Sequence, residues 1–396
     1  MLLNISILHT EIQEFIDANL KTDVTSILLK GTAFPLVETS TIIEQIEAKT
    51  RCEKKLPTWF NSKNIYFPNK LNIEQTSSEK TAKHKADLIT GKSIIDLTGG
   101  FGVDCFYFSK QFKAVTHCEI NPKLSEIVNH NYKQLGVENI KTLAVDGMAY
   151  LSETNAIYDW IYIDPSRRHD SKGKVFFLND CLPNVPQYLD VLFSRAKNIM
   201  IKTAPLLDLS VGISELKQVK TIQIVALNNE VKELLWILEA GFSGQTTIET
   251  INLKKDKNET FNFVLDEEKT IESNYSKPLT YLYEPNSAIL KSGAFNSIAL
   301  HFNIFKLHKH SHLYTSDVLI DFPGRVFKIE KTLQYNKKEI KKLRLSKANI
   351  TTRNFPETVQ NIRKKFNIKD GGELYLFFTT DLDNNKVVLF SKRVNS

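Results

Sequence analysis

Six short apolar runs between residues 93 and 227 alternate with segments of helical character, and this alternation restricts the fold more than any other feature. The runs read SIIDL, AVTHCE, IKTLAVD, WIYID, NIMIKT and TIQIVAL. Segments such as NPKLSEIVNHNYKQL and CLPNVPQYLDVLFSRA lie between them and are long enough for crossover helices. This order predicts βαβ units, which build a mostly parallel sheet with helices on both faces.

The end of this region predicts a different connection. The run NNEVKELLWIL follows TIQIVAL directly, with no residues left for a crossover helix. Two strands joined so closely form a hairpin, so we expect the last strand of the sheet to be antiparallel.

The segments on either side of the sheet have other patterns. Residues 1–76 show helical spacing in LHTEIQEFI and TIIEQIEA, whereas the runs TTIETINL, TFNFVLD and SIALHFNIF beyond residue 240 alternate as strands do. The C-terminal part predicts a helix over PETVQNIRKKF and a hairpin of ELYLFFTT with KVVLFSK. We therefore expect a helical region at 1–76, an α/β domain at 77–240, an α+β segment at 241–322 and a second α+β region at 323–396.

Composition places the chain among soluble globular proteins, with 42% hydrophobic and 24% charged residues. No apolar run approaches the ~18 residues of a membrane span. The N-terminus lacks the basic-then-apolar order of a signal peptide, so a cytoplasmic location is expected.

No metal site is expected. Four cysteines are scattered without C-x-x-C spacing, which suggests free thiols: Cys52, Cys105, Cys118 and Cys181. A group of histidines lacks the acids or cysteines that would complete a zinc site: His301, His308, His310 and His312.

Positive charge is concentrated near the C-terminus. Between Asp321 and Lys369 there are 14 basic and 4 acidic residues, a local excess of 14 − 4 = 10, whereas the whole chain carries +7. Such a surface suits a polyanion, because phosphate contacts release condensed counterions. A solvated lysine-rich face is the alternative.

A glycine-rich loop follows the first apolar run. The run ends at Asp96, and Gly99, Gly100 and Gly102 precede the next helix. Glycines allow a main chain to approach a ligand closely, and the helix N-terminus adds free N–H groups. The spacing departs from G-x-G-x-x-G, which disfavours a nucleotide-dependent oxidoreductase.

Four consecutive strands are expected to finish in an acid at the same edge of the sheet: Asp96, Glu119, Asp146 and Asp164. Glu119 follows Asp96 by 119 − 96 = 23 residues, which is where an acid accepts from the hydroxyls of a bound ribose. Asp146 could accept from an adenine amino group. A helix cap explains one such acid, but capping explains four poorly.

The motifs DLTGGFGVD, CEINP, VDG and YIDPSRR, in this order, resemble those of class I S-adenosylmethionine-dependent methyltransferases. More narrowly, the chain resembles bacterial RNA methyltransferases with a helical N-terminal region, a Rossmann-like catalytic domain, a ferredoxin-like segment and a C-terminal THUMP-like domain. The resemblance covers nearly the whole chain and is strongest between residues 77 and 233. It implies that 241–322 is the ferredoxin-like segment and 323–396 the basic THUMP-like domain.

The resemblance implies S-adenosyl-L-methionine as the cofactor. Its methionine part would lie on the glycine loop, its ribose at Glu119 and its adenine at Asp146, with the helix before the first strand bordering the methionine end. The implied cofactor-binding residues are Asp96, Thr98, Gly99, Gly100, Phe101, Gly102, Glu119, Ile120, Asp146, Gly147, Ser77, Ser78 and Thr81. For the last three, simple helix capping is the alternative.

The fourth strand ends in a partly matching catalytic motif. Methyltransferases that act on an exocyclic amine often carry Asp/Asn-Pro-Pro-aromatic here. Asp164 and Pro165 match that pattern, but Ser166 and Arg167 replace the second proline and the aromatic residue. The resemblance implies that the carboxylate and the proline carbonyl accept the two N–H groups of the amine and aim its lone pair at the methyl group. All four residues are therefore expected at the catalytic centre.

Arginines and lysines are the expected substrate contacts. Arg167 and Arg168 could stack on a flipped base or bind a phosphate, and Phe101 or Tyr162 are alternative stacking rings. The expected substrate- or RNA-binding residues are Arg167, Arg168, Lys202, Lys337, Lys338, Lys341, Lys342, Arg344, Arg363, Lys364 and Lys365.

The leading hypothesis is an S-adenosylmethionine-dependent methyltransferase (EC 2.1.1.-) that methylates a base nitrogen, an exocyclic amine, of tRNA or rRNA. A DNA or protein methyltransferase would use the same chemistry on another substrate. A non-catalytic RNA-binding or assembly factor that retains the fold is the third possibility, because the Asp-Pro-Pro-aromatic motif is incomplete.

Overall fold

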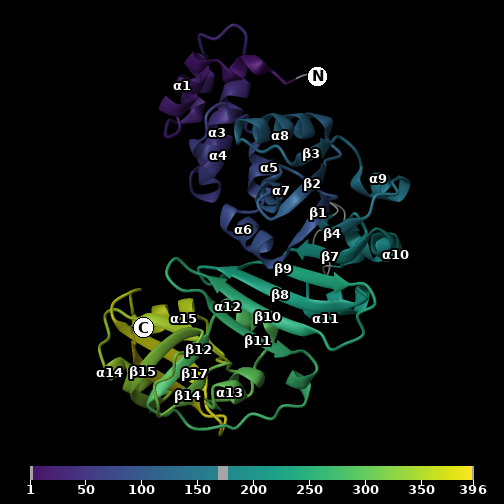
Figure 1. The fold of residues 1–396 in the computed structure, drawn as a ribbon. Helices are drawn as coiled ribbons and strands as arrows, with labels where there is room; N and C mark the ends of the chain where they lie inside the picture. Colours follow the sequence, from purple (N-terminus) through teal and green to yellow (C-terminus); the bar gives the residue numbers. More distant parts are fainter. Residues whose placement is uncertain (1–2, 168–176, 395–396) are drawn as a thin grey trace. The chain divides into compact units, whose positions relative to one another are not determined.

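The computed structural model describes residues 3–167 and 177–394, which fall into two compact units (Figure 1). Unit 1 comprises Met1–Lys220 and Leu235–Ser243, and unit 2 comprises Thr221–Leu234 and Gly244–Ser396. The chain passes from one unit to the other within strands β8 (Val219–Leu227) and β9 (Glu230–Glu239).

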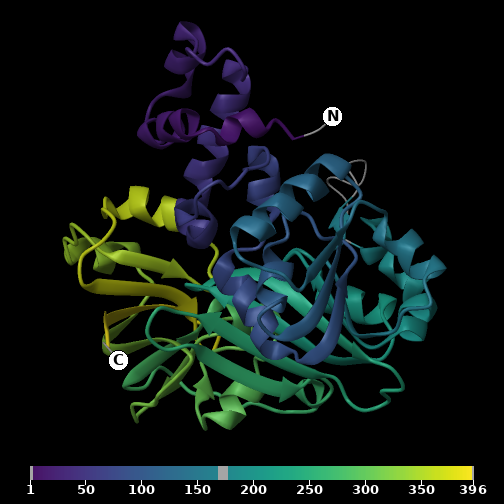
Figure 2. The same cartoon turned by 45° about the horizontal axis from the view of Figure 1, so that its top comes forward.

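Short helices form the N-terminal part of unit 1, as the sequence predicts. They are η1 (Ile5–Leu8), α1 (Thr10–Ala18), α2 (Val24–Lys30), α3 (Thr39–Lys55), α4 (Pro57–Asn61), α5 (Lys70–Gln75) and α6 (Glu79–Leu88). Apolar residues at helical spacing are buried, including Ile12 and Ile16 of α1 and Ile42 and Ile46 of α3. In Figures 1 and 2 the purple helices nearest the N-terminus lie together at one end of the unit, whereas α6, in blue, lies beside α7 (Val103–Phe108).

Five parallel strands form the sheet of unit 1, in the order β7-β4-β1-β2-β3. They are β1 (Gly91–Asp96), β2 (Phe112–Cys118), β3 (Ile140–Leu143), β4 (Tyr158–Ile163) and β7 (Ala196–Thr203). The connecting helices are α7 (Val103–Phe108), α8 (Pro122–Gln134), α9 (Gly147–Glu153), α10 (Val185–Arg195) and α11 (Leu209–Glu215). β2 and β3 lie on one side of β1, and β4 and β7 lie on its other side. The switch point between β1 and β4 is where α/β folds bind ligands.

The predicted hairpin is confirmed. β8 and β9 are neighbouring strands, and the turn between them consists of Asn228 and Asn229, with φ of 51° and 65°. A type I′ turn requires positive φ at both central residues, and its twist matches the right-handed twist of the two strands. The sheet continues beyond residue 241, because β10 (Thr247–Leu253) pairs in parallel with β8 and β11 (Glu259–Val264) pairs antiparallel with β10.

A second sheet in unit 2 has the strand order β13-β14-β12-β15-β18-β17-β16. Its strands are β12 (Tyr281–Pro285), β13 (Phe305–Lys306), β14 (Tyr314–Ser316), β15 (Gly324–Gln334), β16 (Asn349–Thr352), β17 (Leu374–Thr380) and β18 (Lys386–Arg393). The helices of this part are η4 (Glu267–Lys269), α12 (Ser287–Ser292), α13 (Ser297–His301), α14 (Lys337–Lys342) and α15 (Val359–Phe366). As predicted, PETVQNIRKKF contributes a helix, and the next two strands pair as a hairpin.

The expectation that SIALHFNIF forms a strand is wrong. Ser297–His301 is helix α13, and only Phe305–Lys306 pairs as a short strand. The carboxylate of Glu268 accepts from the N–H groups of Asn296 and Ser297, at 2.7 and 2.8 Å. This contact satisfies two N–H groups at the start of the helix, and it comes from a residue 28 positions away, which a local pattern cannot reveal.

Across residues 3–167 and 177–394, none of the helices combines the length and the apolar character that crossing a membrane requires. The four cysteines are buried free thiols.

Candidate active site

The four acids predicted at the carboxyl edge of the sheet follow four strands of unit 1. Asp96 ends β1 and lies level with Tyr162 of β4 and His117 of β2. Glu119 follows β2, and Asp164 follows β4. Asp146 precedes helix α9 as its N-cap. The chain therefore carries four carboxylates into the loops of one sheet edge, beside the switch point.

The glycines of the loop have different roles, and two of them serve packing rather than ligand approach. A Cβ at Gly99 would lie 2.2 Å from Nε2 of His117, and a Cβ at Gly102 would lie 2.1 Å from the hydroxyl of Tyr132. Gly100 has φ of +54°, and only the Thr98 carbonyl oxygen, at 3.8 Å, lies near its virtual Cβ. Gly100 is thus the position where the loop leaves room for a ligand.

Glu119 ties two main-chain segments together. Its Oε2 accepts from the N–H of Gly100 at 2.9 Å, and its Oε1 accepts from the N–H of Asn121 at 2.7 Å. The side chain is half-buried, and each carboxylate oxygen has a second lone pair. Glu119 can therefore accept two further hydrogen bonds, as a ribose diol requires, while Ile120 beside it is 68% exposed.

Asp146 acts locally as a helix cap. Its Oδ1 accepts from the N–H groups of Met148 and Ala149, at 2.8 and 3.1 Å, and the residue is exposed. A Cβ at Gly147 would lie 2.3 Å from the carbonyl oxygen of Leu97, so the absent side chain lets α9 begin against the glycine loop. Capping uses Oδ1, so Oδ2 of Asp146 can accept a further hydrogen bond.

Asp96 shapes the loop from inside. It is 2% exposed, and its Oδ1 accepts from the N–H and hydroxyl of Thr98 while its Oδ2 accepts from the thiol of Cys105. Burial raises the pKa of the Asp96 carboxyl to about 7, and the nearby charges of Asp104 and Asp164 add to the rise.

Asp164 is held from two sides. Its N–H donates to Oγ1 of Thr98 at 2.7 Å, which ties the end of β4 to the glycine loop. Its Oδ2 accepts from Nζ of Lys202 at 2.5 Å, and the two side chains are 31% and 14% exposed. Lys202 was expected on the substrate side of this edge, and the ion pair places it beside the predicted catalytic carboxylate.

The rest of the predicted catalytic motif is only partly described. Pro165 is buried, and the hydroxyl of Ser166 donates to the carbonyl of Leu182 at 3.4 Å. Strand β5 (Ser166–Arg167) pairs antiparallel with β6 (Cys181–Leu182), and η3 (Leu178–Asp180) precedes β6. The side chain of Arg167 and the whole of Arg168 lie outside the described residues, so their predicted roles stay predictions.

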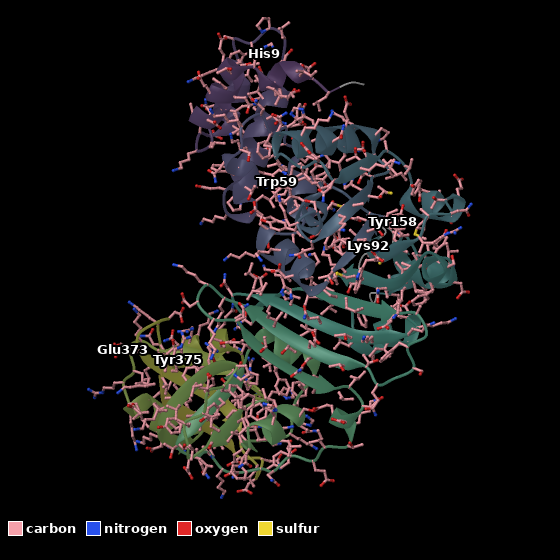
Figure 3. All side chains as sticks on the ribbon, in the orientation of Figure 1. His9, Trp59, Lys92, Tyr158, Glu373 and Tyr375 are labelled. Atoms are coloured by element: carbon pink, nitrogen blue, oxygen red, sulfur yellow. The ribbon has the colours of Figure 1, made fainter. Side chains whose placement is uncertain are left out.

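Phe101 and Tyr162 are buried and not placed to stack on a base. Phe101 is 3% exposed and packs against Trp59 of α4, labelled in Figure 3, with ring centroids 6.2 Å apart. Tyr162 is 1% exposed, and its hydroxyl donates to Oδ2 of Asp104 at 3.0 Å. A substrate base could reach either ring only by displacing this packing.

The residues before β1 form a buried polar network that sequence reasoning missed. Ser78 caps α6 by accepting from the N–H of Thr81 at 3.2 Å, as the capping alternative stated. Ser77 donates to Oδ2 of Asp104 and accepts from Nζ of Lys85, which is fully buried and lies 3.2 Å from Oδ1 of Asp104. The signal in the sequence was Asp104 itself, an acid at an otherwise apolar start of α7.

The predicted RNA-binding residues of unit 2 fall into two groups. One group is exposed on or beside α14 and α15: Lys337, Lys338, Lys341, Lys342, Arg344 and Lys364. Within it, Lys342 pairs with Glu339 at 2.7 Å. The other group is engaged inside the unit, because Arg363 pairs with Asp370 and Lys365 pairs with Glu357 at 2.8 Å.

A shallow hollow lies within the basic part of unit 2. Its volume is about 370 Å³, and it is lined by Arg344, Leu345, Ser346, Phe366, Asn367 and Lys369. Cationic, polar and aromatic side chains in one hollow are the groups that contact phosphates and bases in single-stranded RNA.

Among the side chains that the structure describes, no cluster of three or more His, Cys, Asp or Glu residues is arranged to hold a metal ion.

Two family models match the C-terminal part of the chain. A ferredoxin-like domain matches residues 281–323, and a THUMP domain-like family matches residues 324–393. A comparison with curated proteins gives no match.

A solved structure resembles this chain over nearly its whole length. It is a proposed methyltransferase from Porphyromonas gingivalis W83, 31% identical, with a TM-score of 0.90 over 98% of this chain and 98% of that chain. An rRNA methylase from Streptococcus thermophilus is 14% identical, with a TM-score of 0.30 over 40% of this chain and 93% of its own. A tRNA m1G37 methyltransferase from M. jannaschii is 13% identical, with a TM-score of 0.30 over 41% of this chain and 50% of its own.

Proposed function

Because the chain belongs to the methyltransferase family that includes the Porphyromonas gingivalis protein, we propose that it transfers a methyl group from S-adenosylmethionine to a base nitrogen of tRNA or rRNA. One observation carries this proposal. The N–H of Asp164 donates to Thr98, so the predicted catalytic carboxylate is anchored to the loop predicted to hold the cofactor. The Asp164 carboxylate, which would accept from the target amine, and the methyl group of the cofactor would then lie at the same sheet edge.

The residues of unit 1 fit S-adenosylmethionine. Gly100 leaves open space above the loop, Glu119 can accept from a ribose diol, and Oδ2 of Asp146 can accept from an adenine amine. When bound, S-adenosylmethionine supplies a methyl group on a sulfonium sulfur, and the electron pair of the broken C–S bond stays on that sulfur. The loop, Glu119 and Asp146 would hold the cofactor at the switch point.

Glu119 provides the test of the cofactor site. Glu119→Ala should weaken binding of the demethylated cofactor by about 2–4 kcal/mol, because two charge-assisted hydrogen bonds are lost. Isothermal titration calorimetry measures this loss, and Glu126→Ala, on the neighbouring helix α8, is the control. Unchanged affinity in Glu119→Ala would remove Glu119 from the site.

Asp164 and Pro165 would orient the nitrogen. The lone pair of an exocyclic amine is delocalised into its ring, which makes it a poor nucleophile. The Asp164 carboxylate and the Pro165 carbonyl can accept its two N–H groups and turn the lone pair out of the ring plane. Once methylated, the nitrogen would release one proton, which the Asp164 carboxylate can accept and pass to water.

The basic part of unit 2 supports RNA as the substrate. Exposed cations of α14 and α15 provide phosphate contacts, and the THUMP-like match covers both helices. Double-stranded DNA and protein are the competing substrates.

The experiment compares the modified nucleosides of tRNA and rRNA from a deletion strain with those of its parent by mass spectrometry. One methylated nucleoside should be missing in the deletion strain. Purified protein with labelled S-adenosylmethionine should restore it on RNA from that strain, and should label neither DNA nor protein extract. Cofactor binding without any transfer to RNA would favour the non-catalytic factor.

A further inference from the structure

Asp164 and Lys202 come from the ends of neighbouring strands in unit 1. Ile163 of β4 and Ile201 of β7 are register partners, so the residues that follow them emerge side by side. Nζ of Lys202 lies 2.5 Å from Oδ2 of Asp164. Both side chains are partly exposed, at 14% and 31%, and therefore both belong to the surface of the sheet edge.

The position of this pair is fixed from the β1 side. Thr98 accepts from the N–H of Asp164 and donates its own hydroxyl to Oδ1 of Asp96 at 3.2 Å. The charges of Asp104 and Asp164 both act on the buried Asp96, and Lys85 pairs with Asp104. Lys202 is the cation that faces Asp164 from β7, so the two side chains form a fixed acceptor and donor next to each other.

We propose that Lys202 is a specificity-determining residue, whose ammonium donates to the acceptor atom beside the nitrogen that is methylated. This inference rests on the proposed function. While Asp164 accepts from the N–H of the target nitrogen, Lys202 reads the adjacent position, so the pair recognises a base edge on which a donor and an acceptor are neighbours. Paired contacts of this kind discriminate between base edges far better than one contact does.

The substrate class follows from this geometry. An amino group next to an unprotonated ring nitrogen occurs in adenine, cytosine and guanine. The aliphatic amine of a lysine side chain has no such neighbouring acceptor, and the ribose 2′-hydroxyl presents an O–H instead of an amino group. An ammonium carries three N–H donors, of which the bond to Asp164 engages one. The carboxylate also compensates its charge, so the pair reads hydrogen-bond geometry rather than attracting phosphate.

The test is a double-mutant cycle with full-length protein, S-adenosylmethionine and a short RNA that contains the nucleotide identified by mass spectrometry. The second RNA carries an analogue in which the ring nitrogen beside the amine is replaced by C–H. The protein variants are Lys202→Met, which has no donor, and Lys202→Arg, which retains donors. Lys197→Met is the matched control, because Lys197 lies on the same strand, is 69% exposed and pairs with Glu239 at the surface.

We expect Lys202→Met to lower kcat/KM on the normal RNA by about 10- to 100-fold, and the analogue to cost the wild type the same factor. Lys202→Met should therefore have the same kcat/KM on the analogue as on the normal RNA, because the contact is already absent in this variant. Lys202→Arg should recover part of the rate, and Lys197→Met should behave as the wild type. Calorimetry with the demethylated cofactor should show unchanged affinity in Lys202→Met.

Two outcomes overturn the inference. If the two losses multiply in the variant on the analogue, Lys202 only holds Asp164 and does not read the base. If Lys202→Met acts on the normal RNA as the wild type does, Lys202 has no role in the reaction. A wild-type protein that methylates no RNA overturns the proposed function, and this inference with it, before any variant is compared.

Discussion

At the scale of single residues, the site depends on which oxygen of each acid is already occupied. Glu119 and Asp146 each accept hydrogen bonds from main-chain N–H groups and can accept more. Asp96 is buried under the loop and is not accessible to a ligand. Asp164 is the acid whose carboxylate meets a cation rather than a main-chain donor. This difference supports the proposed division between acids that would hold the cofactor and the acid that would act on the substrate.

Asp164 is the residue whose loss should affect turnover most. Asp164→Ala should lower methyl transfer by at least about 100-fold and leave RNA affinity nearly intact, because its hydrogen bond matters chiefly in the transition state. Asp164→Asn keeps one acceptor oxygen and should retain partial activity. Single-turnover rates and filter binding measure the two quantities. Full turnover in Asp164→Ala would exclude amine methylation by this mechanism.

Asp96 should make stability depend on pH. Burial raises the pKa of its carboxyl from 3.8 to about 7. A folded pKa above the unfolded one means that the contribution of Asp96 to stability is fully present below pH 3.8 and is lost as the pH rises through about 7. Asp96→Asn cannot ionise, so its stability relative to the wild type should increase between pH 4 and 7, by up to about 4 kcal/mol. Urea unfolding at several pH values tests this, and a constant difference would contradict it.

At the scale of elements, the glycine loop is defined by what it packs against. His117 and Tyr132, from β2 and α8, occupy the space where side chains at Gly99 and Gly102 would lie. Behind the loop, Trp59 packs against Phe101 and against Phe106 of α7, with ring centroids 6.2 and 4.8 Å apart. The N-terminal helices of unit 1 thus support the loop that is proposed to bind the cofactor.

Two alanine variants should separate packing from ligand binding in this loop. Gly99→Ala places a methyl group against His117 and should lower the free energy of unfolding by about 1–3 kcal/mol. Gly100→Ala meets open space, so it should cost only the roughly 1–2 kcal/mol of a left-handed residue but should weaken cofactor binding strongly. Thermal unfolding and calorimetry distinguish the two. Equal cofactor affinity in Gly100→Ala and the wild type would show that no ligand lies above Gly100.

At the scale of the whole molecule, the ferredoxin-like and THUMP-like segments are not independent. β12 pairs with β15 and β15 with β18, so both segments contribute to one sheet of unit 2. Glu284 on β12 is 3% exposed and pairs with Arg325 and Arg353 of the THUMP-like segment. A chain cut near residue 321 would leave this charge buried without its partners, which is strongly destabilising. RNA binding should therefore be tested by substitution rather than truncation.

Charge reversal on α14 should weaken RNA binding without affecting cofactor binding. The combined change of Lys337, Lys338 and Lys341 to Glu removes three exposed cations, so RNA affinity should fall and the salt dependence of log K should decrease by about 2. The control reverses three other exposed lysines of unit 2: Lys255, Lys257 and Lys269. Titrations at several salt concentrations measure RNA affinity and its salt dependence. Equal losses of RNA affinity in the two variants would rule out α14 as an RNA contact.

The sequence predicted the alternation of strands and helices between residues 93 and 227, the hairpin that follows it and the candidate acids, because these depend on local periodicity and on acids at the ends of apolar runs. It also indicated a helix and a hairpin near the C-terminus for the same reason. These features depend on residues that are close in the sequence, so they can be predicted without knowledge of distant contacts.

The tertiary structure shows which of these residues are paired and which are buried. The Lys202–Asp164 pair, the burial of Lys85 with Asp104 and the helix start at Ser297 all join residues 19 or more positions apart. It also showed that Arg363 and Lys365 bind acids of their own unit, whereas the α14 lysines are exposed. Charge and spacing are properties of the chain, but burial and pairing are set by which segments fold against each other.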